Sequence, residues 1–236
     1  MKKFLINIIC CFIPSKGVRH KFREFTKNTK PQNNIIEIVK KDGRRVRVKR
    51  VRGCKFVFTG DNNRIVLHEP LGNLLLNVCV SSGVYIELQS STVYQRRLRI
   101  VKRGGDKFQN KLIVGRDFSS TDWVYCDFCC GGGDIIIGDD CLFANGVLWT
   151  GDFHAIVDVN SGQILNRNKS IVIGKHVWFG SGVRVLKGGG VSDNTVVAMQ
   201  SLITKSFNES NVILGGVPAR IIKRGVDWSR KFPDAF

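Results

Sequence analysis

The chain has 236 residues, of which 43% are hydrophobic, and it carries a formal net charge of +18. This is enough apolar material for one substantial core, and no apolar stretch reaches the roughly 18 residues of a membrane-spanning helix. The charge is uneven, because residues 1–52 hold 16 lysines and arginines against 3 acidic residues. Such a segment attracts anionic surfaces: phospholipid, nucleic acid or an acidic polymer.

Residues 1–13, MKKFLINIICCFI, imitate a signal peptide, with two lysines before a short apolar run. No small-residue cleavage site follows, and Pro14 leads into a basic stretch, which argues against export. Two interpretations of residues 1–34 stay open. The segment either lies in the interface of an anionic membrane, with residues 1–30 in peripheral contact with lipid, or covers the core with a solvated charged face. We expect a cytoplasmic protein, with contact to the inner face of the cell membrane under the first interpretation.

Residues 35–57 predict a β-hairpin. The stretch IIEIVKKDGRRVRVKRVR places two strand-like runs around an Asp42-Gly43 turn. Such a hairpin can cap an open sheet edge of the domain that follows.

The eight cysteines do not form a metal-site pattern. The group CDFCC, residues 126–130, contains one CxxC, but a zinc site needs a second ligand pair at suitable spacing, and none is apparent. We therefore predict reduced, mostly buried thiols and no metal.

An apolar residue recurs at every sixth position in the C-terminal half, and a small or β-branched residue lies four places after most of these positions. The series is Ile173, Phe179, Val185, Val191, Val197 and Ile203. A helix cannot hold a period of six on one face, because it has 3.6 residues per turn. Short strands joined by tight corners can, and stacked coils of this kind form a β-solenoid. We assign this domain to residues 58–206, with looser spacing before residue 114, and a C-terminal tail to residues 207–236.

Three stretches carry a family resemblance: IVIGKHVWFGSGVRVLKGG, TVVAMQSLITKSF and VILGGVPARIIK. Over about Ile135 to Ile222 the sequence resembles the hexapeptide-repeat acyltransferases. The likeness is to the maltose/galactoside acetyltransferase-like branch and to the bacterial capsule and lipopolysaccharide O-acetyltransferases. It implies an all-β fold, a left-handed parallel β-helix, a homotrimer and acetyl-CoA as co-substrate.

Residues 148–172 interrupt the repeat with a loop that contains TGDFHAIVDVN. In the resembling family the corresponding loop carries the catalytic histidine, which matches His154. An imidazole with a pKa of about 6.5 suits the removal of a proton from an attacking sugar hydroxyl. Asp152 is near enough in sequence to fix the tautomer of this histidine, although a backbone carbonyl could do so instead. The alternative for His154 is a solvent-exposed loop residue with no catalytic role.

Strand alternation points Trp178 outward, and the resemblance puts the corresponding tryptophan in the active-site cleft. Packing of Trp178 against a neighbouring subunit is the other interpretation.

The resemblance implies that acetyl-CoA lies in a groove between subunits. Many relatives have GAGS where this chain has AMQS at 198–201, so Met199 should narrow the groove. Asp127 is the candidate for acceptor binding. The residues assigned to acetyl-CoA by family matching are Gly180, Ser181, Ala198, Met199, Thr204, Lys205, Pro218, Arg220 and Lys223.

The sequence therefore favours an O-acetyltransferase that moves acetyl from acetyl-CoA to a hydroxyl of a cell-surface polysaccharide. A basic N-terminus fits an acceptor that is anionic or lipid-linked. The alternatives are an acetyltransferase for a small sugar, an amino sugar or a xenobiotic, and a non-catalytic basic scaffold. The DxH and HVW elements together argue against a scaffold, and nothing resembles an aromatic-studded RNA-binding motif, so we expect no nucleic-acid partner.

Overall fold

The computed structural model describes residues 31–92 and 95–235. The predictions for residues 1–30 therefore lie outside the described residues. Residues 33–236 make up one compact unit. Among the described residues, no helix has the length and apolar character needed to cross a bilayer.

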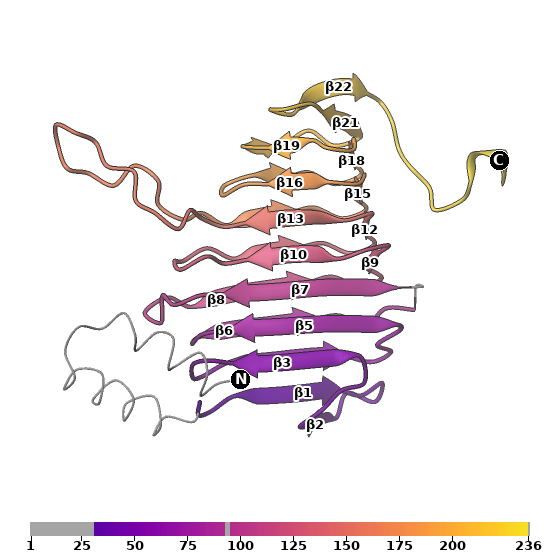
Figure 1. Ribbon diagram of the computed structural model, residues 1–236. Helices are drawn as coiled ribbons and strands as arrows, with labels where there is room; N and C mark the ends of the chain where they lie inside the picture. The colour runs from indigo at the N-terminus through magenta and orange to yellow at the C-terminus, as the bar shows by residue number, and fades with distance from the viewer. Residues whose placement is uncertain (1–30, 93–94, 236) are drawn as a thin grey trace. The chain divides into compact units, whose positions relative to one another are not determined.

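The compact unit is a parallel β-solenoid whose strands stack into three sheets (Figure 1). Sheet A contains, in spatial order, β2 (Arg45–Arg47), β1 (Ile35–Val39), β4 (Arg64–His68), β6 (Val84–Leu88), β8 (Asn110–Val114), β11 (Ile135–Ile137), β14 (Ile171–Ile173), β17 (Gly190–Val191) and β20 (Ser206–Phe207). Sheet B contains β3 (Cys54–Phe58), β5 (Leu74–Val80), β7 (Arg96–Lys102), β10 (Val124–Asp127), β13 (Gly146–Trp149), β16 (Val183–Val185) and β19 (Leu202–Ile203). Sheet C contains β9 (Ser119–Ser120), β12 (Leu142–Phe143), β15 (Trp178–Phe179), β18 (Val196–Val197), β21 (Val212–Gly215) and β22 (Arg220–Arg224), and a 3-10 turn, η1, follows at Pro233–Ala235.

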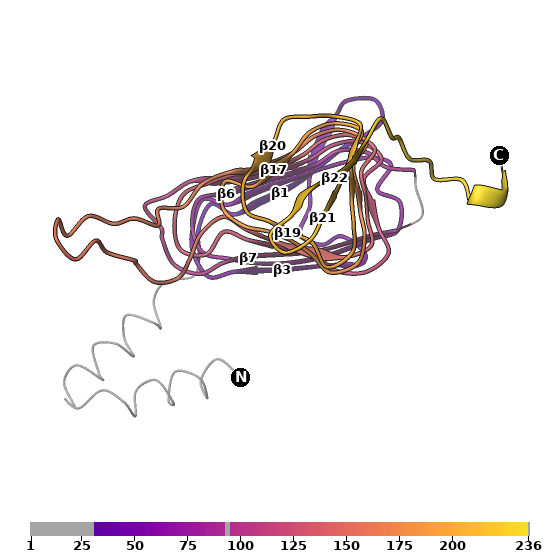
Figure 2. The ribbon, with the colours of Figure 1, turned by 90° about the horizontal axis from the view of Figure 1, so that it is seen from above.

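The coil is left-handed. In Figure 1 the strands of sheet B run from right to left on the near side while the chain climbs, and Figure 2 shows the coils stacked around one axis. The six-residue period accounts for this core. All six residues of the predicted inward series are at most 3% exposed: Ile173, Phe179, Val185, Val191, Val197 and Ile203. The predicted fold class, an all-β parallel β-helix, is confirmed.

The lower coils depart from the six-residue pattern because two sheets, and not three, close them. Sheet C starts at β9, while β5 and β7 are each seven residues long. Buried cations satisfy the carbonyl oxygens of the irregular corners. Arg96 donates to Gln89 O at 2.8 Å, and Lys102 donates to Ser82 O at 2.7 Å. The long strands and these corners explain why the repeat is weak in the sequence before residue 114.

Hairpins end both the N-terminal and the C-terminal side of the solenoid. β2 pairs with β1 in antiparallel register, Val39 opposite Arg45, and β1 continues sheet A in parallel with β4. β1 and β2 thus form a hairpin, and β3 begins at Cys54, within the range 35–57. At the other end β21 still pairs in parallel with β18, so the solenoid extends beyond residue 206 before β22 folds back.

The six cysteines in the described part of the chain are free thiols. Cys126, Cys129 and Cys141 are buried. Burial raises the pKa of Cys129 to about 11 and that of Cys126 and Cys141 to about 12. These thiols are packing residues with little thiolate at neutral pH.

Candidate active site

The loop predicted to interrupt the repeat leaves sheet B after β13 and returns to sheet A at β14. It projects well beyond the corner of the solenoid (Figures 1 and 2). Several of its apolar side chains face solvent in the single chain, among them Phe153, Ile156, Val159, Ile164 and Leu165. A projecting apolar surface of this kind is typical of a segment that contacts another chain.

The base of the loop is held by polar contacts that fix the backbone next to His154. Asn166 Nδ2 donates to Asp152 Oδ2 at 2.7 Å and to the backbone oxygen of His154 at 2.8 Å. Lys187 Nζ forms an ion pair with Asp152. The hydrogen bond from Lys187, followed by that from Asn166, lowers the pKa of Asp152. The carboxylate therefore anchors the loop backbone through Asn166, while the His154 side chain stays exposed.

Sequence reasoning missed Asn166 and Lys187. Asn166 lies 12 residues after His154 within an irregular loop, and Lys187 is in the corner after β16. No periodic or motif signal marks either residue, because their contact depends on how the loop returns to the solenoid.

Trp178 lies on the outer face of sheet C, as predicted, and is 40% exposed. It stands in an outward column with Leu142 below it and Val196 and Ile213 above it. Trp178, Val196 and Ile213 form one wall of a cleft of about 790 Å³. The other wall comes from the C-terminal segment and consists of Val226, Asp227, Trp228, Ser229, Lys231 and Pro233. The Trp228 ring lies 6.1 Å from the Trp178 ring at an interplanar angle of 41°.

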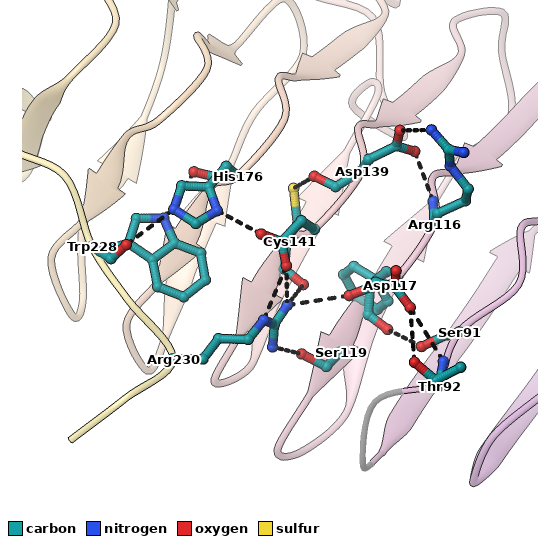
Figure 3. A network of polar contacts seen from close by, with 12 residues as sticks. Ser91, Thr92, Arg116, Asp117, Ser119, Asp139, Cys141, His176, Trp228 and Arg230 are labelled. Carbon is teal, nitrogen blue, oxygen red and sulfur yellow. Dashed lines mark hydrogen bonds and ion pairs between the residues drawn. The ribbon is translucent and has the colours of Figure 1, made fainter. Parts of the chain in front are cut away.

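Residues 226–231, the C-terminal strap, are clasped onto sheet C through His176 (Figure 3). The His176 ring stacks on Trp228 at 4.3 Å, and Trp228 Nε1 donates to the His176 backbone oxygen at 2.8 Å. On its other side the His176 ring bonds through Nδ1 to Asp140 Oδ2 at 2.6 Å. Arg230 donates to Asp140 Oδ1 and, at 2.7 Å, to Ser119 Oγ. No motif in the sequence marks this strap, since the contacts of Trp228 and Arg230 join positions at least 52 residues apart.

We predict that the strap binds more tightly at acidic pH. Burial disfavours the charged ring, but the hydrogen bonds to Asp140 and to the Trp228 carbonyl, with the nearby charge of Asp227, raise the pKa of His176 above its ordinary 6.5. Because its pKa is raised on folding, the protonated His176 ring contributes its full stabilisation below pH 6.5. This stabilisation is lost as the pH rises through the pKa of His176 in the folded protein. The measurement is the denaturant midpoint of the parent and of His176→Asn from pH 5 to 9. We expect the difference between the two denaturant midpoints to be largest at acidic pH. A difference that stays constant from pH 5 to 9 would contradict a role for the charged His176 ring.

The residues assigned to acetyl-CoA fall into three places. Gly180 and Ser181 lie at the corner after β15, directly below Ala198 and Met199 at the corner after β18. A Cβ at position 180 would lie 2.7 Å from the Met199 backbone nitrogen, so glycine is required for this stacking. Met199 is 67% exposed, and its side chain points away from the coil.

The remaining donor candidates lie elsewhere on the solenoid. Thr204 and Lys205 form the corner between β19 and β20, and Lys205 Nζ lies 5.6 Å from the Phe207 ring. Pro218, Arg220 and Lys223 belong to the turn and strand that close the C-terminal end. A single chain therefore does not gather all nine residues around one pocket.

The structure also separates His154 from Trp178 within one chain. The loop of His154 projects from the corner between sheets B and A, whereas Trp178 lies on sheet C across the coil (Figure 2). Asp127, the acceptor candidate, is at the end of β10 below the loop and is 7% exposed. Its carboxylate accepts from Arg103 Nη1 at 2.9 Å and from Cys129 N at 2.8 Å.

No protein-family model matches the chain. The chain is 33% identical over 124 residues to a polysialic acid O-acetyltransferase of Escherichia coli O1:K1 and 40% identical over 100 residues to that of Neisseria meningitidis. These matches cover 51% and 42% of this chain and 39% and 46% of the relatives, so the chain matches less than half the length of each. It is also 33% identical over 100 residues to the galactoside O-acetyltransferase of Escherichia coli K12, covering 42% of this chain and 48% of that protein.

Two solved structures share the fold. The polysialic acid O-acetyltransferase OatWY superposes with a TM-score of 0.59 at 21% identity, covering 89% of this chain and 95% of that one. The polySia-specific acetyltransferase NeuO gives a TM-score of 0.58 at 22% identity, covering 86% and 88%. The resemblance to hexapeptide-repeat O-acetyltransferases, stated from the sequence, is confirmed by these relatives and this solenoid.

Proposed function

We propose that this chain is an O-acetyltransferase that moves an acetyl group from acetyl-CoA to a hydroxyl of a capsule or lipopolysaccharide sugar. The observation that carries the proposal is the exposed His154 on a projecting loop of a solenoid whose relatives are polysialic acid O-acetyltransferases. The basic balance of the chain fits an anionic polymer as acceptor.

In the proposed reaction His154 acts as general base. Its neutral imidazole takes the proton of the sugar hydroxyl while the hydroxyl oxygen attacks the thioester carbonyl carbon. The carbon–sulfur bond then breaks, and the imidazolium returns the proton to the leaving thiolate. The products are an acetyl ester and free CoA, and His154 ends neutral as it began.

Asp152 serves this reaction as a positioning residue. Its bonds to Asn166 and Lys187 fix the backbone on which His154 is carried. Because the loop backbone is already fixed, less conformational entropy is lost when the imidazole is placed against the reacting atoms. Orientation of the imidazole tautomer is then left to a partner other than Asp152.

The proposed site lies between subunits of a homotrimer. Its support is the separation of His154 and Trp178 across one coil, together with the exposed apolar side chains of the loop. A loop that reaches a neighbouring copy would bury these side chains and set His154 beside the Trp178 of that copy. Trp178 and the nine donor candidates then bind acetyl-CoA, and no metal takes part.

Residues 1–34 form a basic N-terminal segment in this proposal. Contact of residues 1–30 with an anionic membrane, and a cytoplasmic location at its inner face, would bring the enzyme to lipid-linked acceptors. The support is compositional: residues 1–52 hold 16 cationic side chains against 3 acidic ones.

The test is incubation of the full chain with labelled acetyl-CoA and a panel of capsular and lipopolysaccharide oligosaccharides. We expect free CoA thiol to be released with one glycan class, and NMR to place the label on a hydroxyl of that glycan. Transfer to a free small sugar or a xenobiotic and to no polymer would reject the polysaccharide acceptor. Absence of transfer to every acceptor, with the chain folded, would reject the enzyme.

A further inference from the structure

A shallow groove runs beside the root of the His154 loop, on the outer face of sheet B. Its volume is about 320 Å³, and it lies at the ends of β7, β10 and β13, of which β13 leads directly into the loop (Figure 1). The inference drawn from it rests on the proposed function. The residues that line it are Arg99, Val101, Arg103, Tyr125, Cys126, Asp127, Val147 and Trp149.

Strand register brings two aromatic side chains and a free guanidinium into this groove. Arg99 is opposite Tyr125 in neighbouring strands, and its guanidinium carbon lies 5.5 Å from the centre of the Tyr125 ring. Trp149, opposite Asp127, is 37% exposed. Within the described part of the chain Arg99 has no acidic partner. Stacking on Tyr125 presents its planar fork of donors to solvent.

The second arginine of the groove is held in place. Asp127, 7% exposed, accepts from Arg103 Nη1 at 2.9 Å and thereby neutralises part of its charge. The Arg103 guanidinium carbon lies 5.4 Å from the Phe153 ring centre, and Phe153 directly precedes His154. The groove is thus joined to the loop through one cation–π contact.

This combination selects a particular ligand chemistry. Planar guanidinium groups bind carboxylates with paired, charge-assisted hydrogen bonds. Exposed aromatic faces pack against the apolar faces of ring-shaped ligands and hold them at small entropic cost. An acidic ligand without a ring would leave Tyr125 and Trp149 unused, and a neutral sugar would leave Arg99 unpaired.

We propose that this groove is an acceptor subsite for a sugar that bears a carboxylate. Arg99 pairs with the carboxylate, and Tyr125 and Trp149 pack against the sugar rings. Arg103, fixed by Asp127, links the bound polymer to the catalytic loop through Phe153. Asp127 is then a positioning residue and does not contact the acceptor.

The test compares two arginines of the same strand and face. Arg99→Gln removes the proposed carboxylate partner, and Arg97→Gln is the matched control, because Arg97 lies outside the groove beside Asp122. With an acidic oligosaccharide we expect Arg99→Gln to raise the acceptor KM about 10- to 100-fold, with the KM for acetyl-CoA unchanged. With the same oligosaccharide after reduction of its carboxylates, parent and variant should be alike. Equal effects of the two substitutions, or equal use of acidic and reduced acceptors by the parent, would overturn the proposal.

A binding measurement without donor separates this proposal from the proposed reaction. Calorimetric titration of the full chain with the acidic oligosaccharide should show binding that weakens about 10- to 100-fold in Arg99→Gln and not in Arg97→Gln. Such binding without acetyl transfer would keep the subsite and reject the enzyme. Transfer to sugars that is insensitive to Arg99 would keep the enzyme and reject the subsite.

Discussion

Replacement of His154 by alanine is expected to lower kcat for acetyl transfer by about 10²- to 10⁴-fold, the range contributed by general base catalysis. The side chain is exposed at the side of a projecting loop, so its loss leaves no cavity and should not affect folding. The loop backbone at this position is fixed by Asn166, which contacts the His154 carbonyl and not its ring. The measurement is the rate of CoA thiol release in the presence of the acceptor glycan.

A control variant in the same loop keeps this result interpretable. Gln163→Ala changes another exposed polar side chain of the loop, and we expect it to retain the parent rate. His154→Ala should retain the oligomeric state and the affinity for acetyl-CoA, both measurable without turnover. A His154→Ala protein with more than a tenth of the parent rate would remove this residue from the mechanism.

The part of the fold that the sequence predicts well is the part with a strict period. From Ile173 to Ile203 each inward residue is followed six positions later by another, so a single periodic signal encodes strand, corner and core. Below β9 the coils have longer strands and two sheets, and Arg96 and Lys102 occupy interior positions. A lysine or arginine at an inward position interrupts the apolar periodicity of the sequence. Its hydrogen bonds to carbonyl oxygens offset the free-energy cost of burying the charge.

The candidate site was only partly visible in the sequence. His154 and Trp178 belong to short motifs, and their exposure follows from a loop and from strand alternation. The anchoring of the loop by Lys187, the strap contact between Trp228 and His176, and the approach of Arg103 to Phe153 each join distant positions. These contacts depend on the register between coils and on the path of the loop and the strap. Neither periodicity nor motif spacing encodes them.

The largest effect on stability is expected from Phe143→Ala, at about 3–5 kcal/mol. Phe143 is fully buried inside the coil, stacked on Phe179 at 4.0 Å and in edge contact with Phe118 at 5.2 Å. These three rings belong to successive coils, with Phe143 in the middle. Truncation of Phe143 therefore opens a cavity at the centre of the stack and weakens its contacts with both the coil below and the coil above. Phe232→Ala is the matched control, since that ring is 83% exposed and should cost less than about 0.5 kcal/mol. The measurement is the denaturant midpoint at constant m-value. Similar losses in the two variants would show that the ring column is not the stabilising element of the solenoid.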